Sequence, residues 1–199
     1  MDEALWALGR GTGVVGLALF SLALVLGITV RSGRSAAGLP KFGVARLHRD
    51  VALLATVFVG IHIVSLFFDS YAQLQLVDLV VPFLAAYQPF WLGLGTLAVD
   101  LTLAVVVTAL LRHRIGARAF RAVHWATYLL WPLSVAHGIG AGTDAAQPWF
   151  LVVVGVCCAA VLGAVAWRVT ARFRRPQPAT PARIKTAATR RLASSEVSS

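Results

Sequence analysis

The sequence has little charge, and its acidic residues are especially few. Asp, Glu, Lys and Arg make up 13% of the 199 residues, whereas about 25% is usual for a soluble domain. Only eight residues are acidic against 18 that are basic, so the formal net charge is +10. A basic surface that reads nucleic acid gathers its charges on one face. Here they lie between apolar runs and near the C-terminus, a placement typical of membrane topology, so we expect no nucleic-acid partner.

Cysteine is also scarce. The two cysteines, Cys157 and Cys158, are adjacent and lie inside an apolar run. They therefore provide neither a disulfide framework nor the spaced thiolates of a CxxC metal site, and we interpret both as packing residues. Glycines of the apolar runs, among them Gly13 and Gly95, let a macrocycle or another helix approach closely, and we favour the interpretation as helix-packing residues.

Hydrophobic residues, by contrast, make up 58% of the chain and gather in long continuous runs. A helix needs about 20 mostly apolar residues to span a bilayer. Five segments meet this requirement: 11–30, 47–68, 90–111, 121–140 and 148–169. The sequence therefore predicts an all-α membrane protein over residues 1–170, with five transmembrane helices and six as the alternative.

The remaining segments are interpreted differently. Residues 71–89 contain Asp78, Pro82 and Pro89, which favours an outer loop with a short interfacial or re-entrant piece over a spanning helix. Residues 171–199 are rich in Arg, Pro, Ala, Thr and Ser. Such a segment cannot bury a core, so we expect a basic, disordered cytoplasmic tail.

Lysine and arginine mark one side of the predicted helices. Every one of them except Arg10 lies in the loop 31–49, in the loop 112–121 or after residue 167. With five spans, these three segments come to the same side of the membrane. Because basic loops stay in the cytoplasm, we expect a plasma-membrane protein whose N-terminus is outside and whose C-terminus is cytoplasmic.

Four of the five histidines lie in predicted spans. His48 and His62 are 14 residues apart on the second span, and His124 and His137 are 13 apart on the fourth. Both spans run outward from the cytoplasm, so His48 comes level with His124, as His62 does with His137. At about 1.5 Å per residue, the two levels are roughly 20 Å apart. Imidazole is a common axial ligand of haem iron, so this arrangement fits two b-type haems, one above the other.

The angular positions of the histidines support the second span and raise a difficulty for the fourth. At about 100° per residue, a 14-residue step leaves the two histidines of the second span about 40° apart. A 13-residue step leaves those of the fourth span about 140° apart on a regular helix. Trp131 and Pro132 lie between them, and proline kinks or rewinds a helix. We therefore predict a distortion near Pro132 that turns both imidazoles towards the second span.

Other interpretations of these histidines remain open. Structural hydrogen bonds between helices are one, although four polar residues matched in depth indicate a functional site. A second is that they bind a transition metal or relay protons, which makes a histidine-based transporter the alternative from another functional class. His113, in a basic loop, is expected to be solvated.

The histidine pattern resembles the ferric-reductase-like transmembrane domain, which is shared by ferric reductases, NADPH oxidases and the haem subunit of methionine-sulfoxide reductase systems. The elements that carry the resemblance are Leu47-His48-Arg49, Ile61-His62-Ile63, Val123-His124-Trp125 and Ala136-His137-Gly138. The resemblance covers about residues 5–170. It implies a di-haem b membrane domain that carries electrons, with the iron ligands paired as His48/His124 and His62/His137.

The sequence also departs from this family. Many relatives continue into a domain that binds flavin and nicotinamide, whereas residues 171–199 contain no GxGxxG motif. The resemblance therefore implies an electron conduit that depends on a separate donor, a flavoprotein or a quinol, and on an acceptor outside. The alternative is a membrane haem subunit that serves a periplasmic reductase or flavoprotein. Whether the chain is an oxidoreductase itself or only its electron-transfer subunit stays open.

Arginines near the histidines are candidates to bind the haem propionates, which are anionic. Arg49 directly follows His48, and Arg10 is the one basic residue expected on the outer side. We predict propionate contacts for both, with Arg46 and Arg121 as weaker candidates. Contact with lipid headgroups is the alternative for all four.

Asp100 lies midway through the third predicted span. An ionisable residue there is costly and usually faces a polar interior. A structural hydrogen bond and a proton relay are both consistent with its position in the sequence.

Overall fold

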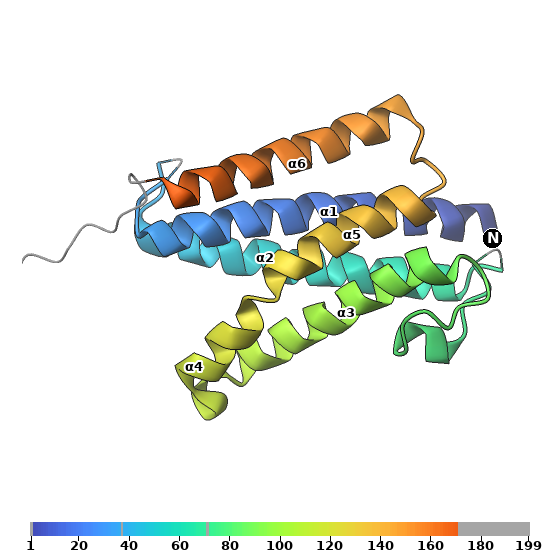
Figure 1. Ribbon diagram of the computed structural model, residues 1–199, viewed down its shortest axis with the longest axis horizontal. Helices are drawn as coiled ribbons and strands as arrows, with labels where there is room; N and C mark the ends of the chain where they lie inside the picture. The colour runs from blue at the N-terminus through green and yellow to red at the C-terminus, as the bar shows by residue number, and fades with distance from the viewer. Residues whose placement is uncertain (1, 37, 71, 171–199) are drawn as a thin grey trace, which may run out of the picture.

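The computed structural model describes residues 2–36, 38–70 and 72–170, and this part of the chain is helical with no strand. Its elements are α1 (Asp2–Ser32), α2 (Lys41–Phe67), the 3-10 helix η1 (Leu76–Leu79), α3 (Pro89–Leu110), α4 (Arg112–His124), α5 (Thr127–Ala141) and α6 (Pro148–Val169) (Figure 1). The predicted all-α membrane class is confirmed. The prediction of a disordered tail at 171–199 falls outside the described residues.

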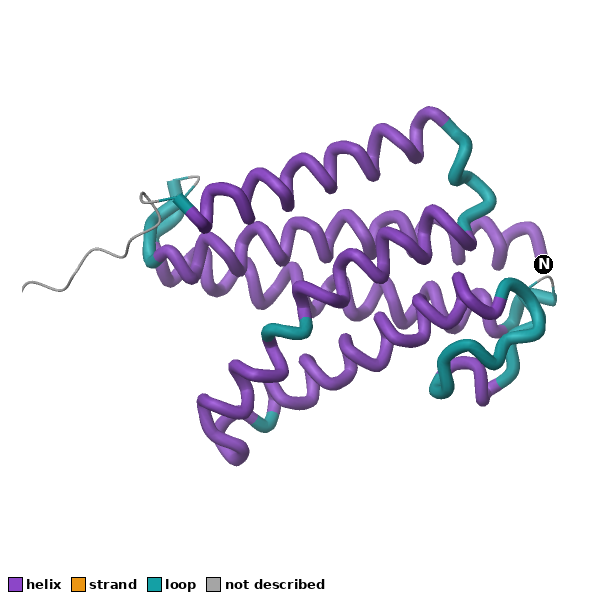
Figure 2. Tube along the Cα trace, in the orientation of Figure 1, coloured by secondary structure: helices purple, strands orange, loops and turns teal. Residues whose placement is uncertain are grey.

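Four helices, α1, α2, α3 and α6, are long and apolar enough to cross a membrane. They correspond to the first, second, third and fifth predicted spans, and the chain is a multi-pass membrane protein. The fourth predicted span, 121–140, is divided between the end of α4 and α5 by a break at Trp125 and Ala126 (Figure 2). α5 has 15 residues, which gives it a length of about 22 Å.

Proline and glycine mark where several of these helices begin and end. α3 and α6 each begin with a proline, Pro89 and Pro148, and Pro40 caps the start of α2. Proline suits the first turn because its missing N–H would have no helical partner there. Gly33, directly after α1, has a φ of 70°, a conformation in which glycine commonly terminates helices.

The helices form two packed groups. α1 packs closely on α2 and also contacts α6, while α3 packs on α5 and α4. α1 also contacts α5, and the indole of Trp131 on α5 donates a 2.8 Å hydrogen bond to the hydroxyl of Ser21 on α1. α2 and α5 run in the same direction, as the sequence predicted (Figure 1). Each is held mainly by its own neighbour, α2 by α1 and α5 by α3.

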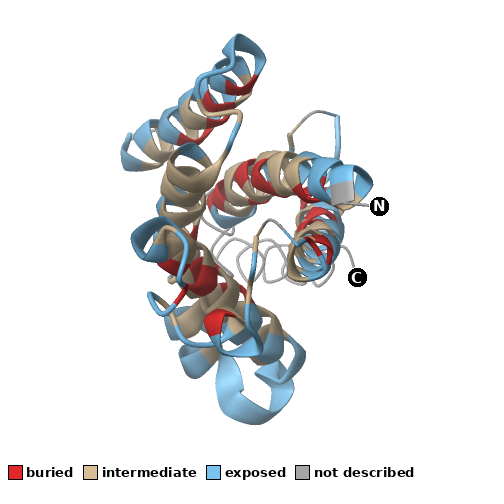
Figure 3. Cartoon of the chain, turned by 90° about the vertical axis from the view of Figure 1, so that its right-hand side faces the viewer, coloured by how far each residue is buried: buried red, intermediate tan, exposed pale blue. Residues whose placement is uncertain are grey.

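Burial follows the orientation of the helix faces. Buried residues lie on faces that meet another helix, and exposed residues cover the outer faces (Figure 3). Leu17 of α1 packs with Phe150 and Val154 of α6 in one small core cluster. Large apolar residues such as Leu53 and Val152 are exposed. In a membrane, such outward faces meet lipid, where hydrophobic side chains carry no cost.

The two ends of the bundle differ in charge. One end of the bundle contains the end of α1, the start of α2, all of α4 and the end of α6 (Figure 1). We call it the basic end because it contains the arginines and lysine of these segments. The opposite end, the far end, contains the chain start and the loops 68–88 and 142–147. The described basic segments therefore share one end, as predicted, and Arg10 alone lies towards the other.

The loop 68–88 contains one short helical element, η1. η1 is closed by a capping box in which the backbone N–H of Gln75 donates to the Asp78 carboxylate at 2.9 Å. The hydroxyl of Thr96 on α3 donates to the backbone carbonyl of Asp78 at 2.8 Å. These contacts fasten the loop to the start of α3.

Candidate functional site

The four histidines of the predicted spans form two facing pairs between α2 and the α4–α5 segment. His48 faces His124 at the basic end, with ring centroids 6.1 Å apart and rings perpendicular. His62 faces His137 towards the far end, with centroids 6.3 Å apart and an interplanar angle of 81°. The structure thus brings together the residues that the sequence paired by depth. We call these the basic-end pair and the far-end pair.

The spacing within each pair fits one metal ion between two imidazoles. Imidazole nitrogen binds a transition metal at about 2 Å and lies about 1.1 Å from its ring centre, so two rings on opposite sides of one ion have centroids about 6 Å apart. A direct hydrogen bond would bring the centroids to about 5 Å. The observed 6.1 and 6.3 Å match the first arrangement.

The angular difficulty of the 13-residue step is resolved by a break at Trp125 and Ala126. Backbone N–H groups there bond three residues back instead of four: Ala126 to Val123 at 2.9 Å, and Tyr128 to Trp125 at 3.1 Å. Such 3-10 turns advance about 120° per residue instead of about 100°. This overwinding adds part of the rotation that a regular helix lacks, and both imidazoles face those of α2.

The predicted location of this distortion was wrong. Pro132 lies inside α5, which continues through it, and the break comes six to seven residues earlier. A proline ring collides with the carbonyl of the residue four before it, and that carbonyl also loses its helical donor. For Pro132 this residue is Tyr128, two residues after the break. The prediction placed the distortion at the proline, whereas the backbone departs from the α-helix nearly two turns towards the N-terminus.

Three of the histidines rest against a neighbouring helix in the same way. The Nδ1 atoms of His48, His62 and His137 lie 2.9, 2.7 and 2.9 Å from the backbone carbonyl oxygens of Ala23, Gly9 and Trp91. In each case the residue four positions after that carbonyl is a glycine: Gly27, Gly13 and Gly95. We call each carbonyl with its glycine a seat.

The seat glycines make room for the imidazoles. A Cβ atom at Gly95 would lie 2.7 Å from His137, one at Gly13 would lie 2.9 Å from His62, and one at Gly27 would lie 3.2 Å from His48. Any larger residue would push the ring away from its carbonyl. The interpretation of Gly13 and Gly95 as helix-packing residues therefore missed their role. No signal identifies them without the tertiary partner, because glycine is common in membrane helices.

The seats also determine which ring nitrogen is available for a metal ion. A carbonyl oxygen only accepts hydrogen bonds, so Nδ1 of a seated histidine carries the proton. The neutral ring then has its free lone pair at Nε2. Metal-binding histidines typically donate their other N–H to a carbonyl or carboxylate, which fixes both tautomer and orientation. The seated residues therefore fit axial ligation of a haem iron.

His124 is different from the other three. Its Nδ1 atom is fully buried, yet it has no hydrogen-bond partner among the described residues. No glycine of the described segments opens space against its ring. Its ring also lies near that of Phe120, one turn earlier, at a centroid distance of 5.2 Å. His124 is also the last residue of α4, next to the break.

A cavity of about 940 Å³ opens beside the basic-end pair. Cofactor and ligand sites typically measure about 300–1,000 Å³. Both histidines of the pair line it, and so do six arginines, with no acidic residue: Arg31, Arg46, Arg49, Arg112, Arg121 and Arg168. An apolar space with this rim fits a flat apolar group that carries carboxylates, as haem does.

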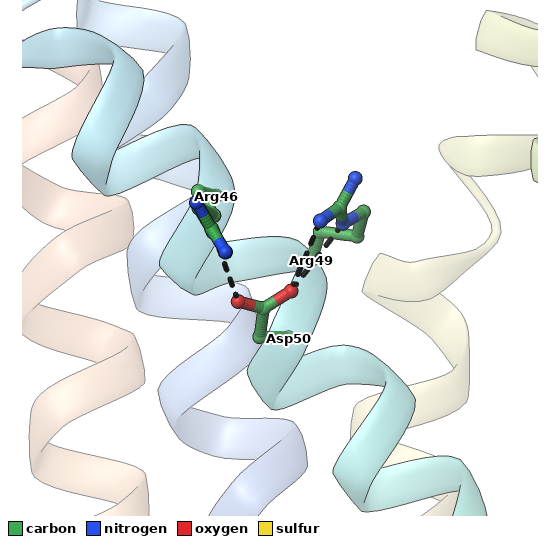
Figure 4. Close-up of polar contacts among 3 residues, drawn as sticks. All are labelled: Arg46, Arg49 and Asp50. Atoms are coloured by element: carbon green, nitrogen blue, oxygen red, sulfur yellow. Dashed lines mark hydrogen bonds and ion pairs between the residues drawn. The ribbon is translucent and has the colours of Figure 1, made fainter.

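Arg49 and Arg46, two of the predicted propionate contacts, share a carboxylate at the rim of this cavity. Arg49 donates to Asp50 at 3.3 Å, and Arg46 lies 3.8 Å from its other oxygen (Figure 4). All three side chains are largely exposed. Such ion pairs contribute at most about 1 kcal/mol, so Asp50 holds neither arginine firmly. Their predicted roles, and that of Arg121, remain predictions.

Arg10 has a stronger partner than the sequence suggested. Its Nε donates to Asp144 at 2.6 Å, a second nitrogen forms an ion pair with the same carboxylate, and the guanidinium lies 3.9 Å above the Trp6 ring. This contact ties α1 to the loop between α5 and α6. The propionate contact predicted for Arg10 remains a prediction, and Asp144 would compete with a propionate for the same guanidinium.

Asp100 is half-buried and is not among the residues that line the cavity beside the basic-end histidines. Its position on α3, four residues after Thr96, puts it on the face that carries the loop 68–88, whereas Gly95 on another face receives His137. The arrangement gives no support to a proton relay from Asp100 to the imidazoles.

Arg168 is a site residue that sequence reasoning missed. It was counted only as a topology signal, but its guanidinium donates to the hydroxyl of Tyr128 and lies 4.7 Å above the Trp125 ring. It thus connects the end of α6 to the break between α4 and α5. An arginine at the membrane boundary of the last span was the available signal, but nothing in the sequence connected it to Trp125.

Comparison with known proteins gives one match. A family model described as "Ferric reductase like transmembrane component" matches residues 12–135. The matched range covers more than half of the chain and includes three of the four paired histidines, with His137 two residues beyond it. No curated protein and no solved structure matches the chain.

Proposed function

We propose that this chain, which belongs to the ferric-reductase-like transmembrane family, is a di-haem b-type cytochrome that carries electrons across the plasma membrane. The observation that carries the proposal is the spacing of the two facing histidine pairs, 6.1 and 6.3 Å between ring centroids. Bound haem supplies reversible one-electron chemistry whose potential depends on its ligands and surroundings.

The protein's own task in this proposal is to hold two pairs of imidazoles apart and in line. α1 supports the histidines of α2, and α3 supports His137 of α5, through the seat carbonyls. His48 and His124 hold one haem, and His62 and His137 hold the other. Because the supporting helices lie outside the ligand helices, the space between α2 and α5 stays open for the cofactor.

The two histidine levels divide the path of an electron across the bilayer into shorter distances. His48 and His62 are 14 residues apart on one continuous helix, which corresponds to about 21 Å along its axis. The hydrocarbon core of a membrane is about 30 Å thick. Two haems at this spacing bring each side of the membrane within reach of one of them.

The charges at the basic end suggest the direction of electron flow. In the proposed orientation this end faces the cytoplasm, in accordance with the positive-inside rule. The arginines at the cavity rim bind haem propionates and attract an acidic face of the donor. The donor is a cytoplasmic flavoprotein or a quinol, and the acceptor lies outside.

A second function within the redox class differs only in the acceptor that the far-end haem serves. There the chain is a haem subunit that passes electrons to a periplasmic reductase or flavoprotein docked on the loops 68–88 and 142–147. Exposed apolar residues in the first of these loops, including Leu76, Val80 and Leu84, favour contact with lipid or with a partner over free solvent.

A reduced-minus-oxidised spectrum of the purified chain, with haem and metals quantified, tests the proposal. We expect a Soret band, a sharp reduced α-band and two haems per chain. Colourless protein after expression with ample haem would disprove the proposal. Stoichiometric zinc, copper or nickel in such colourless protein would instead support the histidine-based transporter.

A further inference from the structure

The four imidazoles are not held equally, although their two pairs have the same spacing. His48, His62 and His137 each donate Nδ1–H to a seat carbonyl at 2.7–2.9 Å. The far-end pair therefore has two seated rings, whereas the basic-end pair has one. Hydrogen bonds of this kind orient a metal ligand and make it a better donor to the metal.

His124 lacks this support for reasons that the backbone shows. Its buried Nδ1 has no acceptor among the residues that the structure describes. It ends α4, and the next two residues form the overwound break before α5. Backbone at a helix end yields more easily than the interior of a helix. By contrast, His137 lies inside α5, and His48 and His62 lie inside α2.

Space for movement exists on the same side. The cavity of about 940 Å³ is lined by both rings of the basic-end pair, and it extends to Trp125, Tyr128 and Trp131 around the break. The haem would occupy the part of this cavity between the two rings, and the part around the break is where a ring that left the iron could move aside for a small molecule. The far-end rings are instead packed against the backbone of α1 and α3 through Gly13 and Gly95.

We propose that His124 is an exchangeable ligand, so that the basic-end haem binds small external ligands while the far-end haem stays closed. The exchange breaks one iron–imidazole bond and forms one bond to a neutral ligand such as carbon monoxide, without transfer of an electron. The inference rests on the proposed function, because it presupposes bound haem. It assigns a small-molecule binding position to one level of a protein that otherwise only conducts electrons.

Variants that keep one level each provide the test. His62→Ala/His137→Ala retains the basic-end pair, and His48→Ala/His124→Ala retains the far-end pair. Haem is quantified in each full-length protein, and carbon monoxide difference spectra are recorded after reduction with dithionite. We expect carbon monoxide binding by the basic-end haem and none by the far-end haem. Binding by the far-end haem, or by neither, would overturn the inference.

A glycine variant tests the same idea with all four histidines in place. Gly95→Ala puts a Cβ atom 2.7 Å from the His137 ring, whereas a Cβ atom at Gly11 meets nothing within 4 Å. We expect wild type and Gly11→Ala to bind one carbon monoxide per chain, and Gly95→Ala to bind two. A Gly95→Ala protein that contains both haems but binds no more than wild type would show that seats do not control ligand exchange.

These measurements separate failure of the inference from failure of the proposed function. Protein without haem disproves the cytochrome proposal itself. Protein with two haems that are both closed to carbon monoxide supports the cytochrome and contradicts only the exchangeable role of His124.

Discussion

The two histidine levels have nearly the same ring spacing but very different surroundings. At the far end, both imidazoles donate to backbone carbonyls, and the Arg10–Asp144 contact closes the bundle nearby. At the basic end, one imidazole has no acceptor among the described residues, a large cavity opens beside it, and the Arg46–Arg49–Asp50 cluster is exposed. The fold therefore sets the distance between the two imidazoles at both levels, but it holds both imidazoles by hydrogen bonds only at the far end.

This difference shows that ligand geometry and ligand support are separate properties of such a site. Geometry depends on the parallel course of α2 and α5 and on where each histidine lies along them. Support depends on α1 and α3, which contribute a carbonyl and a glycine to each seated ring. If the two levels are independent, a change at one of them should leave the other intact.

The largest expected effect is loss of a single haem. His62→Ala removes a ligand from the far-end pair only, and His48→Ala from the basic-end pair only, so each variant should keep one haem per chain. Redox titration should then reveal different remaining components, because their surroundings differ in charge. His113→Ala, which changes a histidine outside both pairs, should keep two haems. Loss of both haems from either single variant would show that the levels are coupled.

The next effect concerns the seats. An alanine Cβ would lie 2.9 Å from the His62 ring at Gly13 and 3.2 Å from the His48 ring at Gly27. Because forced overpacking costs about 1–3 kcal/mol, we expect both variants to lower thermal stability, Gly13→Ala more than Gly27→Ala. Gly11→Ala on the same helix should be neutral or stabilising, since alanine favours helix by up to about 1 kcal/mol. An equal loss of thermal stability in all three variants would show that the seat glycines are no more crowded than Gly11.

A smaller effect is expected at the far-end ion pair. Asp144→Asn removes the charge that Arg10 contacts while it preserves the shape of the side chain. Side-chain exposures of 30% and 13% indicate partial burial, and hydrogen bonds to charged groups contribute about 1.5–3 kcal/mol. Partial exposure reduces this, so we expect a destabilisation near the lower value, measured by thermal unfolding in detergent. An unchanged melting temperature would show that the contact does not close the far end.

The smallest effect is expected for the matching change at the basic end. Asp50→Asn removes the carboxylate shared by Arg46 and Arg49, both of which are largely exposed. Surface ion pairs contribute at most about 1 kcal/mol, so thermal stability should change less than in Asp144→Asn. The two variants together measure how much tighter the far end is. A larger loss of thermal stability in Asp50→Asn than in Asp144→Asn would show that the basic end, not the far end, is held more tightly.

Much of the fold was predictable from the sequence because membrane helices leave strong signals. Continuous apolar runs identified four of the spans, and the positions of lysine and arginine identified the common end of their loops. Counting along two parallel helices was sufficient to pair His48 with His124 and His62 with His137. These inferences need only helix geometry and the order of the segments.

The details that distinguish the two levels could not be predicted in this way. Every residue has a backbone carbonyl, so nothing in the sequence identified those of Gly9, Ala23 and Trp91 as acceptors. The position of the break depends on how α5 packs on α3 and α1. The proline alone indicated a distortion too far along the helix. Arg10 and Asp144 are 134 residues apart in the sequence, and only the packing of the helices brings them into contact.

The seats have a consequence for how this protein tolerates change. The groups that orient three of the four imidazoles are main-chain atoms, so no side-chain substitution at Gly9, Ala23 or Trp91 can delete them. A random mutation can reach this orientation only indirectly, by filling one of three glycines or by displacing a helix. Substitutions therefore rarely alter the orientation of the far-end imidazoles. The orientation of His124 depends on the side chains around it, so substitution of those side chains can change it directly.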